Sequence, residues 1–292
     1  MKPRATSLLE AKTLSAEISP STLTSVTGGG VRSPLTGVGC ESIREEFPVL
    51  KERGIIYLDN AASTLKPHRV VEAMRGFTYK SYANVHRGLH KLSMEASRAY
   101  EEAHETVARL IGASWDEIVF LRNTTEAMQN AALLALFNDI VRRGDEIIVT
   151  MADHHSTLLP WVRVARRAGA KVKLVPLNED GVPRWEDLSG LINEKTKVVA
   201  FGHVSNVTGS VAPVKEIVKE AKRVGALVVL DAAQSVPHMP VNVRDLGVDM
   251  MAFSGHKMLG PTGIGVLYVR RDLQEELEPP LGGGGAVARV AQ

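Results

Sequence analysis

Residues 226–234 read ALVVLDAAQ, five apolar residues followed by Asp231, two alanines and Gln234. A strand that is apolar at every position is typical of a parallel sheet whose two faces are both covered by helices. The polar residues begin where this strand ends, and open α/β sheets bind their ligands at the carboxyl ends of strands. The stretch therefore predicts a layered α/β protein with a ligand site close to Asp231.

Strand-like and helical segments alternate on both sides of this stretch. Two predicted helices, residues 158–168 and 213–224, are each followed by a glycine, a residue that often ends a helix. Other helices are expected at residues 67–79, 92–110, 126–141 and 273–277. Besides residues 226–230, strands are expected at residues 55–58, 146–150, 171–177, 198–203, 249–254 and 265–269. The pattern predicts a mostly parallel seven-stranded sheet flanked by helices.

The composition is that of a globular protein, with 44% hydrophobic and 23% charged residues in 292. The 35 lysines and arginines nearly balance the 33 aspartates and glutamates, so no strong field for nucleic acid or an anionic membrane is expected. Apolar runs fall far short of the roughly 20 residues that a membrane helix needs. The single cysteine, Cys40, cannot form an internal disulfide, which favours a reducing, cytoplasmic location.

Residues 1–40 differ from the rest of the chain. They are rich in Ser, Thr and Gly and show no helical or strand period, which indicates a disordered tail. The basic residues in this stretch leave open a transit peptide, which would place the protein in an organelle instead.

Polar side chains at three strand ends together suit one cofactor. Asp231 follows one strand, Lys257 another and His154 a third. Taken singly, such an aspartate is more often a helix cap, such a lysine a solvated charge and such a histidine a structural residue. Pyridoxal phosphate needs an amine to bond its aldehyde, a carboxylate to keep its ring nitrogen protonated and a flat side chain over its ring. The combination therefore favours this cofactor.

Thr124 and Thr125 open the helix predicted after Arg122, where backbone N–H groups and hydroxyls suit a phosphate. The alternative is a plain capping segment. Asp153 and the histidines at 154 and 155 are the competing candidates for a metal. Because adjacent histidines point in different directions and neither has a helical His-x-x-x-His partner, no metal site is predicted.

Several motifs in a fixed order carry a family resemblance over residues 47–285. They are YLDNAAS at 57–63, NVHRG at 84–88, RNTTE at 122–126, DHHS at 153–156 with PW at 160–161, HVSNVTG at 203–209, DAAQ at 231–234, SGHK at 254–257 and GPTGIG at 260–265. At these residues the chain resembles the class V aminotransferase-fold family, and within it the Suf-type cysteine desulfurases and selenocysteine lyases.

The resemblance implies a pyridoxal phosphate-dependent transferase of fold type I that converts L-cysteine to L-alanine and passes the sulfur on for iron–sulfur cluster assembly. Lys257 would bond the cofactor and shuttle the α-proton, and His154 would stack on the ring and assist proton transfer. The other implied cofactor ligands are Thr124, Thr125, Asn206, Asp231, Gln234, Ser254 and His256. A homodimer is implied as well, with His86, Arg87 and Gly283 reaching the partner's site.

The resemblance also divides the chain. After the tail, residues 41–60 would be an N-terminal segment, residues 61–285 the cofactor-binding large domain and residues 286–292 the start of a connection. Family members continue into a small domain that holds the sulfur-accepting cysteine and an arginine for the substrate carboxylate. Cys40 precedes the matched region, so we expect a truncated chain with an incomplete active site.

Three functions stay open at this point. The leading expectation is that the chain is part of a cysteine desulfurase that acts on L-cysteine or L-selenocysteine and delivers sulfur to an acceptor protein. Other class V enzymes, namely a selenocysteine lyase, β-lyase, epimerase or aminotransferase, are the alternative within catalysis. A fragment without catalytic activity is the alternative outside it.

Overall fold

The computed structural model describes residues 40–86 and 88–282. Its seven-stranded sheet has the order β1-β7-β6-β5-β4-β2-β3. The strands are β1 (Ile118–Leu121), β2 (Glu146–Thr150), β3 (Lys171–Val175), β4 (Thr196–Gly202), β5 (Leu227–Asp231), β6 (Met250–Ser254) and β7 (Gly265–Val269). β3, β2, β4, β5 and β6 run parallel to one another, whereas β7 is antiparallel to β6 and β1. The predicted fold class, an α/β protein with a mostly parallel seven-stranded sheet, is confirmed.

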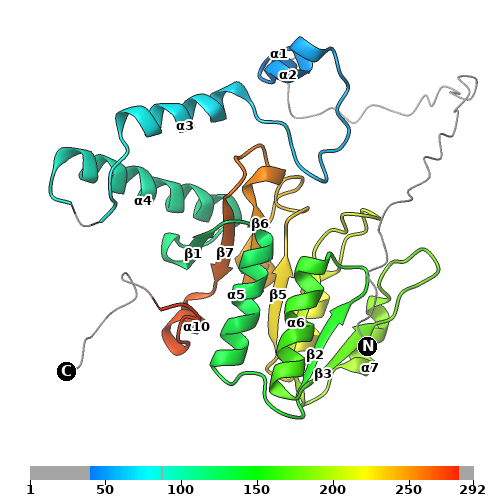
Figure 1. Cartoon of the computed structure of the whole chain (residues 1–292). Coiled ribbons are helices and arrows are strands. Elements are labelled where there is room, and N and C mark those ends of the chain that lie inside the picture. The colour runs from blue at the N-terminus through cyan, green and yellow to red at the C-terminus, as the bar shows by residue number, and fades with distance from the viewer. Residues whose placement is uncertain (1–39, 87, 283–292) are drawn as a thin grey trace, which may run out of the picture. The chain divides into compact units, whose positions relative to one another are not determined.

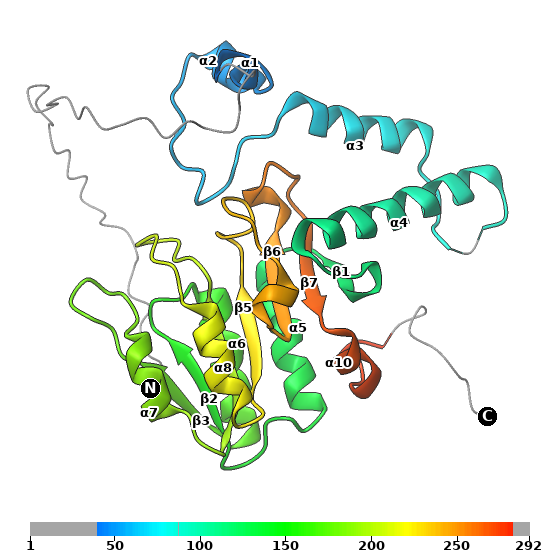
Figure 2. The same cartoon turned by 180° about the vertical axis from the view of Figure 1, so that it is seen from behind.

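Helices cover both faces of the sheet. Figure 1 shows α5 (Thr124–Phe137) and α6 (His155–Ala168) in front of the strands, and Figure 2 shows α8 (Val214–Lys222) on the opposite face. On β5, Val229 packs in the α5 and α6 layer, while Val228 and Leu230 pack in the α8 layer. This two-sided burial is the reason that the strand is apolar at every position.

The remaining helices are short, apart from α3 and α4. They are α1 (Cys40–Glu45), α2 (Pro48–Arg53), α3 (His68–Lys80), α4 (Lys91–Ile111), α7 (Leu188–Leu191), α9 (Val243–Leu246) and α10 (Arg271–Glu276), with 3-10 turns η1 (Trp115–Glu117), η2 (Trp185–Asp187) and η3 (Gly255–Lys257). No helix among these described ranges is long and apolar enough to cross a membrane.

The ends of α5 and α6 are set by the backbone conformation and side-chain hydrogen bonds of the residues that follow them. Gly169 ends α6 as expected, with a φ of 74° that only glycine adopts freely. The helix predicted at 126–141 instead stops at Phe137. Asn138 donates its side-chain amide to the carbonyl of Leu134 at 3.0 Å, and Asp139 has a φ of 53°. Because the next residue has left-handed backbone, the helix cannot continue through it.

One predicted strand is wrong. Residues 55–58 form no strand, and Ile56 and Leu58 are 82% and 88% exposed. β1 takes the place of this segment as the seventh strand, by pairing with β7 at the sheet edge. An apolar run of four residues does not reveal whether a sheet edge lies beside it, since pairing depends on distant residues. The proposed domain boundaries stay predictions, and residues 1–39 and 286–292 lie outside the described residues.

Candidate active site

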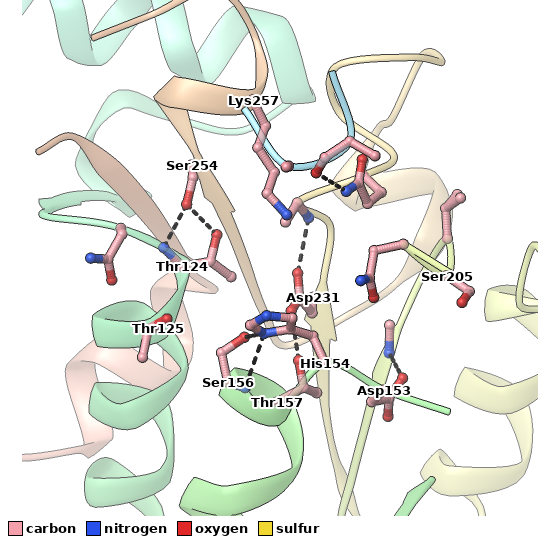
Figure 3. A pocket seen from close by; sticks show the side chains of 18 of the residues that line it. Thr124, Thr125, Asp153, His154, Ser156, Thr157, Ser205, Asp231, Ser254 and Lys257 are labelled. Atoms are coloured by element: carbon pink, nitrogen blue, oxygen red, sulfur yellow. Dashed lines mark hydrogen bonds between the residues drawn. The ribbon is translucent and has the colours of Figure 1, made fainter. Parts of the chain in front are cut away.

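A cavity of about 580 Å³ lies beyond the carboxyl ends of β2, β4, β5 and β6. Its volume falls within the range of roughly 300–1,000 Å³ that is usual for small-molecule sites. All the cofactor residues implied by the sequence line it, namely Thr124, Thr125, His154, Asn206, Asp231, Gln234, Ser254, His256 and Lys257. Figure 3 shows several of these side chains converging from separate elements.

Asp231 is the last residue of β5 and is buried. Its Oδ2 accepts a hydrogen bond from Thr157 Oγ1 at 2.6 Å, and its Oδ1 accepts one from the backbone N–H of Ala233 at 2.9 Å (Figure 3). Both carboxylate oxygens are therefore fixed, one by α6 and one by the loop after β5.

Lys257 lies in η3, directly after β6, and its side chain reaches into the cavity beside Asp231 (Figure 3). Burial lowers the pKa of the Lys257 amine, and the negative charge of Asp231 opposes that change. A lower pKa leaves more of the amine neutral at a given pH. The neutral amine is the nucleophilic form that bonds to carbonyl carbons.

The start of α5 forms a third side of the cavity. Asn123 caps the helix, and Ser254 Oγ accepts a hydrogen bond from the backbone N–H of Thr124 at 2.7 Å. Gly265 permits this approach, because a Cβ on it would lie 2.5 Å from Asn123 Cα. Within the described part of the chain, Thr125 Oγ1 has no protein partner and is exposed. The helix start therefore offers the Thr125 hydroxyl at the end of the helix where anions bind.

His154 caps α6 with its own ring. Nδ1 accepts a hydrogen bond from the backbone N–H of Ser156 at 3.2 Å and lies 2.7 Å from Ser156 Oγ. An Nδ1 that accepts a backbone hydrogen bond carries no proton, so a neutral His154 ring bears its proton on Nε2. The capping contact thereby orients the ring at the cavity wall.

Asp153 is an ionisable group that belongs to the DHHS motif, although the sequence predicts no cofactor contact for it. Its Oδ1 accepts a hydrogen bond from the Gly202 N–H at 2.8 Å, and no partner for the buried Oδ2 lies among the described residues. Burial, and then the charge of Asp231, raise the pKa of Asp153 to about 7. The sequence signal that marked Asp153 as a possible site residue was its position directly before His154 and His155. Among the described residues, no group of three His, Cys, Asp or Glu side chains is arranged to hold a metal.

Gln234 and His256 contact a segment that the sequence reasoning did not assign to the site. Gln234 Nε2 donates to the carbonyl of Ala61 at 2.7 Å, and His256 Nδ1 lies 3.2 Å from Ser63 Oγ. Burial lowers the pKa of His256, and the positive charges of Lys257 and Lys66 lower it further. In the sequence, the only indication that Ala61 and Ser63 belong to the site is their place in the YLDNAAS motif at residues 57–63.

Of the three residues expected to serve a partner's site, the structure describes His86 alone. His86 does not line the cavity, and its Nδ1 lies 4.0 Å from Glu101 Oε1. Arg87 and Gly283 lie outside the described residues.

Known proteins resemble this chain closely. The family described as Aminotransferase class-V matches residues 56–292. A protein of Aeropyrum pernix named "Probable cysteine desulfurase" is 71% identical over 251 residues, which are 86% of this chain and 61% of that protein. The apo structure of a cysteine desulfurase from Thermococcus onnurineus NA1 superposes with a TM-score of 0.81 at 46% identity, over 86% of this chain and 62% of that one.

A further solved structure, "SspA in complex with cysteine", has a TM-score of 0.72 at 31% identity and covers 79% of this chain and 66% of that one. The chain thus spans about 61% of the length of the curated relative from Aeropyrum pernix. The family match includes every described residue that lines the cavity, since the matched region begins at residue 56. The chain belongs to the class-V aminotransferase family.

Proposed function

We propose that this chain is the cofactor-binding part of a pyridoxal phosphate-dependent cysteine desulfurase, which takes sulfur from L-cysteine and leaves L-alanine. The observation that carries the proposal is the meeting of Lys257, Asp231 and His154 in one cavity with the start of α5. Relatives named cysteine desulfurase, and a structural relative solved with cysteine, support the substrate class.

The residues present fit pyridoxal phosphate. Lys257 supplies an amine of lowered pKa, Asp231 a buried carboxylate held by two hydrogen bonds, and α5 an open anion site at Thr125. The cofactor, when bound, withdraws electrons from the substrate's α-carbon and so makes its proton easier to remove.

Each side chain then has a defined task. Asp231 would keep a proton on the ring nitrogen, since its carboxylate faces the cavity. Thr125, His256 and Ser254 would hold the phosphate at the N-terminus of α5. Lys257 Nζ would move the proton to and from the α-carbon of the substrate, and the His154 ring would cover the cofactor and assist that transfer.

Three finer parts of the proposal come from the family resemblance, namely a homodimer, a sulfur-acceptor protein and a role in iron–sulfur cluster assembly. A cytoplasmic location is proposed because the single cysteine suits a reducing compartment. Sulfur removal also requires a thiolate within about 3–3.5 Å of the substrate sulfur. The printed chain holds one cysteine, Cys40, so we expect this chain on its own to release little sulfide.

Two measurements on the purified chain test the proposal. Pyridoxal phosphate followed by borohydride should label Lys257, identified by peptide mass spectrometry, and Lys257→Ala should abolish the label. Label on another lysine in that variant would refute the assignment. A sulfide assay with L-cysteine, repeated with L-selenocysteine and selenide detection, reports turnover. Robust turnover that is lost in Cys40→Ser would identify Cys40 as the nucleophile and contradict our expectation.

A further inference from the structure

Residues 61–66 connect two of the strand ends that form the cavity. At one end of the segment, the carbonyl of Ala61 accepts a hydrogen bond from Gln234, in the loop after β5. At the other end, the N–H and Oγ1 of Thr64 donate to the carbonyl of His256 at 2.9 and 3.0 Å. The segment therefore contacts both the Asp231 loop and the turn that carries Lys257.

Lys66 completes this contact. Its Nζ donates to the carbonyl of His256 at 3.0 Å and to the carbonyl of Thr64 at 2.7 Å. The side chain is half-buried, and none of the ion pairs among the described residues includes it. Its ammonium is thus directed at backbone carbonyls. Burial lowers the pKa of Lys66, which agrees with a charge removed from water.

The carbonyl of His256 belongs to the peptide bond that leads into Lys257. We propose that Lys66 is a positioning residue for Lys257, holding that peptide so that the Lys257 amine points into the cavity. The inference rests on the proposed function, because it concerns the amine that would bond the cofactor. Lys66 does not line the cavity itself, so its effect passes through the turn.

The backbone of the turn shows why it needs to be held. Leu259, two residues after Lys257, has a φ of 68°, a conformation that residues with a Cβ rarely adopt. Its N–H donates to Thr64 Oγ1 at 2.8 Å. Strained backbone persists where surrounding contacts determine it. Here Thr64 contacts Leu259 across 195 residues of sequence, and Lys66 contacts the nearby His256 carbonyl across 190.

Lys66→Met tests the proposal, because it keeps the length of the side chain and removes the donor. Lys66→Arg is the conservative variant. Lys91→Met is the matched control, since Lys91 is 88% exposed and its Nζ lies 3.9 Å from Glu95. All are made in the full chain. The first readout is the rate at which saturating pyridoxal phosphate becomes fixed to Lys257, measured by borohydride trapping over time.

We expect Lys66→Met to slow that rate by about tenfold or more, because small misplacements of a reacting group cost large factors in rate. Lys66→Arg should restore most of the rate, and Lys91→Met should leave it unchanged. A rate in Lys66→Met equal to the unmodified chain's would overturn the inference.

A second comparison separates positioning from a general structural role. The affinity for pyridoxal phosphate is measured in Lys257→Ala and in Lys257→Ala with Lys66→Met. If Lys66 acts through Lys257, the two affinities should agree within about twofold, as expected when the shared partner is absent. A large loss of affinity in the double variant would show that Lys66 supports the whole site instead.

A third readout needs no cofactor. Amide hydrogen exchange across residues 255–260 should be faster in Lys66→Met than in the unmodified chain, while the strands β4 and β5 keep their protection. If the unmodified chain attaches no cofactor at Lys257, the proposed function fails, and this exchange measurement still decides whether Lys66 holds the turn. Equal exchange in both chains would refute it.

Discussion

Replacement of Asp153 by asparagine should change how the stability of the protein depends on pH. Burial, with the charge of Asp231, raises the pKa of Asp153 from 3.8 to about 7 in the folded chain. At about 1.4 kcal/mol for each tenfold change in acid dissociation, the difference of about 3 corresponds to at most about 4 kcal/mol. The residue as a whole is half-buried although its Oδ2 is closed to solvent, so we expect about 2–4 kcal/mol.

The sign follows from proton binding. Between about pH 4 and pH 7 the folded state retains the proton of Asp153 while the unfolded state has lost it. Stability therefore falls as the pH rises through this window, and the full cost is present above about pH 7. Asparagine keeps an oxygen for the Gly202 N–H but never ionises. Its advantage over aspartate should grow with pH.

Urea unfolding without added cofactor measures the effect. The free energy of unfolding of Asp153→Asn minus that of the unmodified chain should rise by about 2 kcal/mol between pH 5 and pH 8. Asp180→Asn is the control, because Asp180 is an exposed turn residue outside the cavity. A difference that stays constant with pH for Asp153→Asn would refute the assignment of a raised pKa to this buried carboxyl.

Three further predictions concern other parts of the chain. Asp231→Asn should leave pyridoxal phosphate bound but slow exchange of the substrate α-proton by about a hundredfold, measured by NMR in D₂O; exchange at the unmodified rate would contradict the role of Asp231. Asp249 is fully buried and pairs with Arg270 at 2.7 Å and with Lys222. Asp249→Ala should therefore lower the free energy of unfolding by about 3 kcal/mol, and an unchanged urea midpoint would show that the pairs contribute nothing. Deletion of residues 1–40 should leave the affinity for pyridoxal phosphate within about twofold, because the stretch has no periodic apolar face; a large loss of affinity in fluorescence titration would count against this.

Local patterns in the sequence determined most of the sheet and the position of the candidate site. The all-apolar stretch before Asp231 predicted a central strand, and β5 is buried on both faces. Strands at 146–150 and 265–269 have the predicted bounds. Because parallel strands end on the same edge of a sheet, the polar residues that follow them had to lie close together. The family motifs then identified the cavity residues as a set.

Tertiary structure alone decided which groups became buried and which distant segments met. Residues 55–58 and 118–121 are both short apolar runs, yet only the second forms a strand, because β7 lies beside it. The raised pKa of Asp153 depends on its burial against Gly202 of β4. The bond from Lys66 to the carbonyl of His256 joins residues 190 positions apart. Burial and pairing of this kind are properties of the folded chain, and no local period in the sequence encodes them.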